Sequence, residues 1–153
     1  MLFRSAFHCI PVTESSRPYL AFWVNNKVYT YNRMLMGLKS APAMWIILMN
    51  HLFSKEIMTE IKKRLPPHLA EKLPEDFTFI IHYIDDLFIY SDNPDIHLLH
   101  LHAVFEALRY AGLKMSPKKC NFYCESMKIL GINMKPTENE LSLDKAKANA
   151  FLN

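Results

Sequence analysis

Apolar and polar positions along this chain predict a short β-hairpin at residues 77–91. Two apolar runs of strand length flank an adjacent pair of carboxylates, Asp85 and Asp86. Aromatic and β-branched residues of this kind suit a pleated, half-buried surface. Aspartate suits turns because its side chain accepts hydrogen bonds from nearby backbone N–H groups. The pattern therefore predicts two neighbouring carboxylates at or near the turn of an apolar hairpin.

The N-terminal half contains a second hairpin pattern and a helix pattern. Apolar runs at residues 19–24 and 28–31 surround a short polar turn, which predicts another hairpin. Apolar residues then recur at helical spacing as far as about Arg64 and predict a single long helix. Ser40 can cap this helix, and Pro42 suits a first turn that needs no N–H donor.

The C-terminal half is predicted to contain two more helices and two strands. Asn93 and the proline and acid after it form a helix start, and Gly112 is expected to end that helix. Strands are predicted at residues 122–124 and 127–134, and a final amphipathic helix at residues 144–152. Helices packed against a largely antiparallel sheet make the predicted fold class α+β.

Composition adds the class of protein and limits its partners. The chain has 153 residues, of which 50% are hydrophobic and 22% charged, as is typical of one globular domain. A formal net charge of +3 is compatible with a nucleic-acid partner without identifying one. Residues 1–10 are already apolar, so we expect the chain to begin inside a strand, as a fragment of a larger protein would.

The cysteines and the apolar runs bear on the compartment. Cys9, Cys120 and Cys124 are an odd number without paired spacing, which indicates free thiols in a reducing intracellular compartment, the cytoplasm or nucleus. A metal site at the last two is the weaker interpretation, because further ligands at suitable spacing are lacking. We expect no membrane partner, since the sequence has neither a bilayer-spanning apolar run nor a signal-peptide pattern.

The pair Asp85 and Asp86 has two interpretations. The simpler is an ordinary polar turn. However, neighbouring carboxylates beside apolar strands repel each other and lose solvation. A divalent cation would offset both costs, and Mg²⁺ prefers oxygen ligands. A metal site is therefore the alternative hypothesis.

Two further segments carry candidate phosphate-binding residues. Gly37 permits a positive φ or a close backbone approach, and it precedes a helix N-terminus that could receive a phosphate. A simple capped helix explains the same residues. Lys118 and Lys119 lie in a basic turn at residues 114–120, where they could contact phosphates or simply be solvated.

Three histidines in the helix after Asn93 raise the question of a zinc site. His97, His100 and His102 have no carboxylate or thiolate at ligand spacing to complete a set. We therefore expect solvated histidines.

A series of short motifs extends along nearly the whole chain. The most specific are Met-Gly-Leu-Lys-Ser-Ala-Pro-Ala at residues 36–43 and Tyr-Ile-Asp-Asp at residues 83–86. Others lie at residues 4–12, 21–22, 29–33, 97–101, 112–122 and 129–131. In this order and spacing they resemble the palm of a reverse transcriptase, most of all that of gypsy-type long-terminal-repeat retrotransposons. The resemblance implies a palm domain over residues 1–153, with an antiparallel sheet, helices on one face, and fingers and thumb largely missing.

The resemblance implies an RNA-directed DNA polymerase that adds deoxynucleotides to a primer 3′ end by a two-metal mechanism. Asp85 and Asp86 would bind Mg²⁺ or Mn²⁺, with Asp85 as the main ligand. Such ions lower the pKa of the primer hydroxyl and stabilise the leaving pyrophosphate. Lys119 would protonate pyrophosphate, with Lys118 as the alternative.

The resemblance also implies the binding residues and partners. Phe7 would lie under the sugar of the incoming nucleotide and exclude a 2′-hydroxyl. The nucleotide-binding residues would be Ser5, Ala6, Phe7 and Gly37. The primer and template residues would be Tyr83, Ile84, Leu130, Gly131 and Lys39. The expected partners are an RNA or DNA template with primer and deoxynucleoside triphosphates, and the parent polyprotein could add ribonuclease H and integrase modules.

Two positions depart from the family pattern. Leu2 stands where the first catalytic aspartate is expected, and leucine cannot ligate a metal. Ile46 stands where a glutamine is usual. Two rival hypotheses therefore remain. One is a catalytically inactive palm remnant that acts as a nucleic-acid or protein interaction domain, and the other is a plain α+β metal-binding domain.

Overall fold

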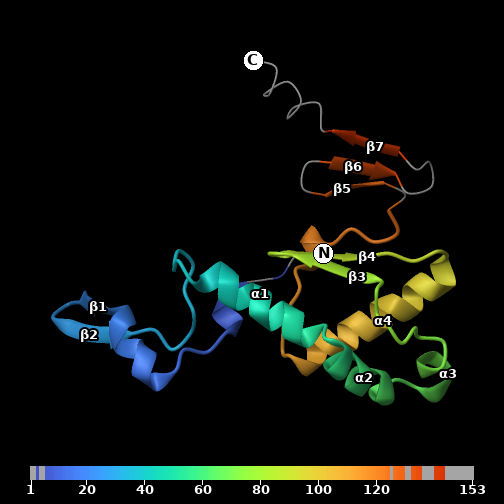
Figure 1. Cartoon of the computed structure of the whole chain (residues 1–153). Coiled ribbons are helices and arrows are strands. Elements are labelled where there is room, and N and C mark those ends of the chain that lie inside the picture. The colour runs from blue at the N-terminus through green and yellow to red at the C-terminus, as the bar shows by residue number, and fades with distance from the viewer. Residues whose placement is uncertain (1–2, 4–5, 125, 130–131, 136–139, 144–153) are drawn as a thin grey trace. The chain divides into compact units, whose positions relative to one another are not determined.

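The computed structural model describes residues 3, 6–124, 126–129, 132–135 and 140–143 (Figure 1). It divides into two compact units, residues 1–120 and residues 121–153. The first unit contains the hairpins, the helices and the hydrophobic core, whereas the second contains a small sheet.

The described residues of the N-terminal segment form 3-10 helices instead of the predicted strand. One spans Ala6–Cys9 and a second spans Glu14–Leu20. Ala6 is buried, and the adjacent Phe7 packs against the same core. A strand would send these neighbours to opposite faces, so the helical turn is what buries both. Phe3 makes an isolated antiparallel bridge to Met115.

The first hairpin is confirmed. Strands β1 (Ala21–Val24) and β2 (Lys27–Thr30) pair antiparallel. Asn25 and Asn26 form the two-residue turn with φ of 48° and 61°, a conformation that asparagine tolerates better than most residues. Every residue of both strands is exposed.

The single long helix predicted up to Arg64 is wrong, because two helices occupy that stretch. Helix α1 (Ala41–Leu52) ends at Phe53, and α2 (Lys55–Arg64) begins after Ser54. The Ser54 hydroxyl accepts a hydrogen bond from Ile57 N at 3.4 Å, with Ser54 itself in an extended conformation. This N-cap starts a new helix although the apolar spacing continues. A short helix α3 (Pro67–Ala70) follows.

The predicted central hairpin is confirmed with shorter strands. Strands β3 (Ile80–Tyr83) and β4 (Asp86–Ile89) pair antiparallel, with Tyr83 opposite Asp86. Helix α4 (Pro94–Tyr110) follows and ends before Gly112, as predicted. Its N-cap is Asn93, whose side-chain oxygen accepts a hydrogen bond from Ile96 N at 2.9 Å.

The core lies between the helices and one face of the β3–β4 hairpin. Figure 1 shows the hairpin lying across α1 and α4, and α2 packs against both of these helices. The largest fully buried side chains are those of Trp45, Met49, Met58, Ile61, Leu87 and Val104. Because Leu87 enters this core from β4, the turn beside it is held by the helices.

The second unit differs from its predicted strands. Strands β5 (Met127–Ile129), β6 (Ile132–Lys135) and β7 (Glu140–Leu143) form an antiparallel sheet in that order. The strand predicted at residues 127–134 is thus two strands, β5 and β6, which pair antiparallel with Ile129 opposite Ile132. Residues 122–124 are irregular, and β7 was not predicted. The predicted helix at residues 144–152 lies outside the described residues.

The α+β fold class is confirmed, with one difference in the sheet. The described strands form three separate antiparallel sheets, two of them hairpins, where one continuous sheet was predicted. The helices pack on one face of the β3–β4 hairpin, as expected for a palm-like fold.

Candidate functional site

The two carboxylates lie at a tight and strained turn. Ile84 and Asp85 are the two loop residues between β3 and β4, and Asp86 is the first residue of β4. Ile84 has a φ of 48°, which a β-branched residue seldom adopts. Strain of this kind costs about 1–3 kcal/mol and persists only where surrounding contacts impose it.

Asp85 has a carboxylate oxygen without a partner. Its Oδ1 atom is buried and accepts no hydrogen bond from the described residues. Burial raises the pKa of this carboxyl, and the neighbouring Asp86 charge raises it further. Such an oxygen carries a desolvation cost that a bound cation would offset.

The basic turn lies close enough to act on Asp85. The ammonium group of Lys119 opposes the other two effects by lowering the pKa of the Asp85 carboxyl. Lys119 ends a short 3-10 helix, Pro117–Lys119, and its side chain is exposed. The bridge between Phe3 and Met115 joins the N-terminal segment to the start of this turn. Segments from both ends of the first unit therefore meet near the carboxylates.

Trp45 links α1 to the carboxylate turn. Its indole Nε1–H donates a hydrogen bond to the Ile84 carbonyl oxygen at 2.6 Å. The ring of Phe3 packs edge-on against the Trp45 ring at a centroid distance of 4.9 Å, and that of Phe7 does so at 6.2 Å. Phe7, one of the predicted nucleotide-binding residues, is thus connected to the turn through one indole ring.

One face of the turn presents apolar side chains to solvent. Ile81 is 55% exposed, Tyr83 50% and Ile84 36%. Leu87 points the other way and is buried, so the hairpin separates a core face from a free apolar face.

The remaining predicted site residues are only partly described. Gly37 and Lys39 lie in the exposed loop before α1. Gly37 has a φ of 88°, and a Cβ there would meet no atom within 4 Å, so the backbone conformation is what favours glycine. Ser5, Leu130 and Gly131 lie outside the described residues, as does Leu2.

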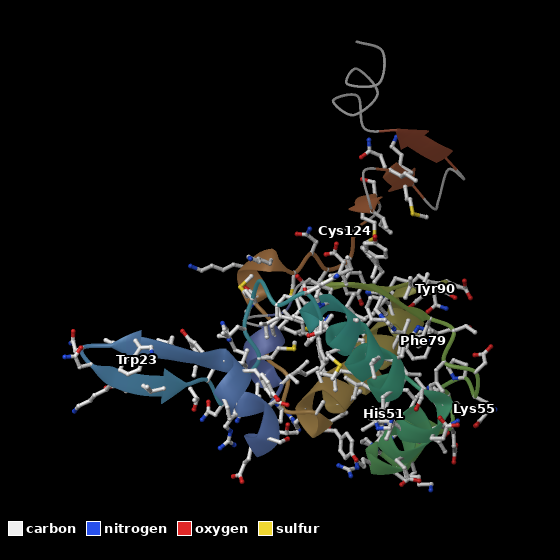
Figure 2. All side chains as sticks on the ribbon, turned by 60° about the vertical axis from the view of Figure 1, so that its left-hand side comes forward. Trp23, His51, Lys55, Phe79, Tyr90 and Cys124 are labelled. Carbon is white, nitrogen blue, oxygen red and sulfur yellow. The ribbon has the colours of Figure 1, made fainter. Side chains whose placement is uncertain are left out.

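The expectation of solvated histidines is wrong for two of the three. His100 is buried and its Nδ1 atom lies 2.7 Å from Ser91 Oγ and 3.2 Å from Tyr90 O. His97 is half-buried, with Nδ1 at 3.1 Å from the same hydroxyl. His102 is exposed, as expected. Figure 2 labels Phe79 and Tyr90, whose backbones bond at the end of the hairpin that these histidines support.

Sequence reasoning missed the contacts that Trp45 and His100 make. A tryptophan on a predicted core face is a usable signal, because a buried indole N–H needs an acceptor. The acceptor itself lies 39 residues away in sequence and is visible only in the fold.

Other features of the described residues define the limits of the site. Within the ranges that the structure describes, histidine, cysteine and acidic side chains do not gather in threes as a metal site would need. A cavity of about 500 Å³ lies between α3 and α4, lined by Leu69, Asp95 and His102 among others, and it includes none of the predicted site residues. No helix in the described part of the chain has the length and hydropathy to cross a membrane.

Asp85 and Asp86 fit a hard divalent cation as a partial ligand set. Both supply carboxylate oxygens, and Asp85 Oδ1 has no other partner in the described structure. Mg²⁺ commonly binds through one or two protein carboxylates and takes further oxygens from substrate phosphates and water.

Comparisons with known proteins identify the family. Residues 3–134 match the family model described as "Reverse transcriptase (RNA-dependent DNA polymerase)". Over 90% of its own length, the chain is 29% identical to polyprotein P3 of Commelina yellow mottle virus. It is 26% identical over 95% to the retrovirus-related Pol polyprotein from transposon gypsy of Drosophila melanogaster. It spans only 6% and 12% of those relatives.

Solved structures agree on the fold. A foamy viral protease-reverse transcriptase in complex with RNA/DNA hybrid matches 99% of this chain with a TM-score of 0.70 and 22% identity. A related structure in complex with double-stranded DNA matches with a TM-score of 0.75 and 21% identity. This chain covers 18% and 23% of those two proteins. With the family model matched over most of its length, the chain belongs to the reverse transcriptase family.

Proposed function

We propose that this chain is the palm region of a retrotransposon-type polyprotein and carries the catalytic carboxylates of an RNA-directed DNA polymerase. The reaction is template-directed addition of deoxynucleotides to a primer 3′ end. Membership in the family supports the reaction class. Relatives of this family in complex with RNA/DNA hybrid and double-stranded DNA support a primer-template as the partner.

The buried, unpartnered Oδ1 of Asp85 is the observation that carries this proposal. A turn that served only to reverse the chain would leave its carboxylates in water or bonded to backbone N–H groups. Here Asp85 holds a desolvated oxygen beside a second carboxylate, Asp86. Mg²⁺ or Mn²⁺ bound there would supply Lewis-acid stabilisation of the charge that develops during phosphoryl transfer.

The other described residues have roles that follow from their positions. Lys119, whose charge acts on Asp85, is the candidate donor of a proton to pyrophosphate. The Phe7 ring, held against Trp45, would exclude a 2′-hydroxyl by its bulk. The exposed side chains of Tyr83 and Ile84 offer an apolar support for the primer end. The open space above Gly37 leaves room for a template backbone.

A catalytically inactive palm is the second candidate, and Leu2 favours it. The resemblance implies a third carboxylate at residue 2 to help hold the cations, and leucine has no oxygen to offer. Under this hypothesis the chain keeps the fold and binds nucleic acid or protein without catalysis. The two candidates predict different behaviour when an aspartate is restored at residue 2.

Metal binding is the first test. Mn²⁺ titration followed by water-proton relaxation should show one class of site in the wild-type chain, and Asp85→Asn should weaken it at least tenfold, or about 1.4 kcal/mol. The matched control is Asp95→Asn, in the first turn of α4 and exposed, which should bind as the wild type does. Equal binding by wild type and Asp85→Asn would contradict the proposed metal site.

Polymerisation is the second test. Extension of a labelled primer on an RNA template should be measured for the wild-type chain, Leu2→Asp, and Leu2→Asp with Asp85→Asn. The polymerase hypothesis predicts that Leu2→Asp raises the rate and that Asp85→Asn abolishes the gain. If Leu2→Asp binds Mn²⁺ and primer-template without extending the primer, the inactive palm is the better description.

A further inference from the structure

We propose that Trp45 is a positioning residue whose indole N–H holds the Ile84 carbonyl and thereby fixes the direction of the Asp85 carboxylate. The proposal deepens the proposed function, because it concerns how the same metal site is arranged. Trp45 touches none of the reacting groups.

The argument begins with the strain in the turn. Ile84 has a φ of 48°, a conformation that its branched side chain disfavours, and Asp85 is the only other loop residue. A two-residue loop offers little freedom to spread the strain. The turn therefore needs an external contact to hold it in this shape.

Trp45 supplies that contact. Its side chain is 0% exposed, and its Nε1–H donates to Ile84 O at 2.6 Å. The indole cannot readily turn away, because the rings of Phe3 and Phe7 pack edge-on against it. The donor therefore lies on α1 and is held by its packing in the hydrophobic core, whereas the acceptor belongs to the turn.

The position of the acceptor explains why the bond acts on Asp85. The Ile84 carbonyl and the Asp85 N–H belong to one planar peptide unit. Holding the carbonyl oxygen sets the rotation of that plane, which sets ψ of Ile84 and φ of Asp85. These two angles determine where the Asp85 side chain leaves the backbone. The hydrogen bond therefore sets the direction of the Asp85 carboxylate without contacting it.

The variant that isolates this effect is Trp45→Phe. Phenylalanine keeps an aromatic ring in the core and removes the N–H donor. We expect its Mn²⁺ affinity to fall about three- to tenfold, up to about 1.4 kcal/mol, because the turn then samples other peptide orientations. Met49→Ala is the matched control, since Met49 is also 0% exposed and lies four residues later on α1. It should lower the melting temperature and leave Mn²⁺ affinity unchanged.

A second readout uses the two indole N–H signals in nuclear magnetic resonance spectra. Trp23 lies on β1, where Figure 2 labels it. Its side chain is 74% exposed, so its N–H should exchange quickly with deuterium. The N–H of Trp45 should exchange much more slowly and be broadened first by Mn²⁺. Assignment follows from Trp23→Phe, which removes the exposed signal alone.

The outcomes separate this proposal from the proposed function. If the wild-type chain does not bind Mn²⁺ while the Trp45 N–H is protected from exchange, the proposed metal site is contradicted and the hydrogen bond is confirmed. The proposal that this bond positions a metal ligand is then overturned as well. If Trp45→Phe binds Mn²⁺ like wild type, or if affinity in Trp45→Phe and Met49→Ala falls in proportion to stability, Trp45 is only a core residue. Weaker binding in Trp45→Phe alone supports the positioning role.

Discussion

The imidazole of His100 lies flat on the ring of Phe79, with centroids 3.7 Å apart and planes 7° apart. Phe79 precedes β3, and its carbonyl accepts the N–H of Tyr90 at the open end of the hairpin. His100 comes from α4 and also meets Ser91 and Tyr90 through Nδ1. Through these contacts, the buried His100 stabilises the end of the hairpin that lies opposite the carboxylate turn.

The first prediction concerns the stability of the fold in mild acid. Burial lowers the pKa of His100 and of His97 below the ordinary value of 6.5. The unfolded state therefore takes up protons first as the pH falls through about 6.5, and the folded state loses stability from there toward the lowered pKa. Above that pH both states are neutral and the contribution is complete. Urea unfolding between about pH 5 and pH 8 measures this slope.

Two variants test which histidine causes the pH dependence of stability. His100→Asn removes one of the two titrating rings and should reduce the pH dependence, with His97 keeping the remainder, while lowering stability at neutral pH. His102→Asn, at an exposed position of the same helix, should keep the wild-type slope. An unchanged slope in His100→Asn would show that the buried ring does not cause the acid sensitivity.

The second prediction concerns the pH dependence of metal binding. Burial and then the Asp86 charge raise the pKa of the Asp85 carboxyl, so a proton competes with the cation at higher pH than for an ordinary aspartate. Mn²⁺ affinity should therefore rise with pH through the raised pKa and level off above it. Asp86→Asn should move this rise to lower pH, because the like charge is gone. A flat profile between about pH 4 and pH 7 would contradict this account of Asp85.

The third prediction concerns the strain at Ile84. Asparagine adopts positive φ more readily than a β-branched residue. Ile84→Asn should therefore raise the free energy of unfolding by about 0.5–1.5 kcal/mol, a part of the strain estimate. It should also weaken primer binding, since it removes an exposed apolar side chain beside Asp85. Thermal unfolding and fluorescence anisotropy of a labelled primer-template measure the two effects, and a loss of stability would argue against strain.

The fourth prediction compares two serines at helix starts. Ser54 caps α2 through its hydroxyl, so Ser54→Ala should destabilise the fold by about 0.5–1 kcal/mol. Ser40 occupies the N-cap of α1 but makes no side-chain capping bond, so Ser40→Ala should change stability by only a few tenths of a kcal/mol. Chemical denaturation of both variants tests this pair, and equal effects would contradict the capping assignment.

Local patterns predicted the hairpins and helix ends because their causes are local. The turn at Asn25 and Asn26 and the cap at Asn93 depend on residues a few positions away. The break between α1 and α2 was missed because Phe53, Ile57 and Ile61 continue one apolar stripe across it. Apolar residues at helical spacing form one continuous stripe in the sequence whether one helix continues or a capping serine starts a new one.

The sequence indicated the carboxylates of the candidate site but not the tertiary contacts that hold them in place. The apolar runs around Asp85 and Asp86 made the pair a candidate, although the local pattern alone was equally explained by a polar turn and the family resemblance favoured the metal site. The partners that shape their surroundings, Trp45 and Lys119, come from segments about 35 to 40 residues away on either side. Lys119 was proposed from the family resemblance, whereas the indole hydrogen bond of Trp45 depends on tertiary packing alone.

The aromatic hairpin β1–β2 has a practical consequence for every measurement proposed above. The rings of Phe22, Tyr29 and Tyr31 stack on one of its faces, and Trp23 is exposed on the other. Such surfaces favour self-association in concentrated solution. Sedimentation and the emission maximum of Trp23 should therefore change on dilution, and titrations belong in the concentration range where both are constant.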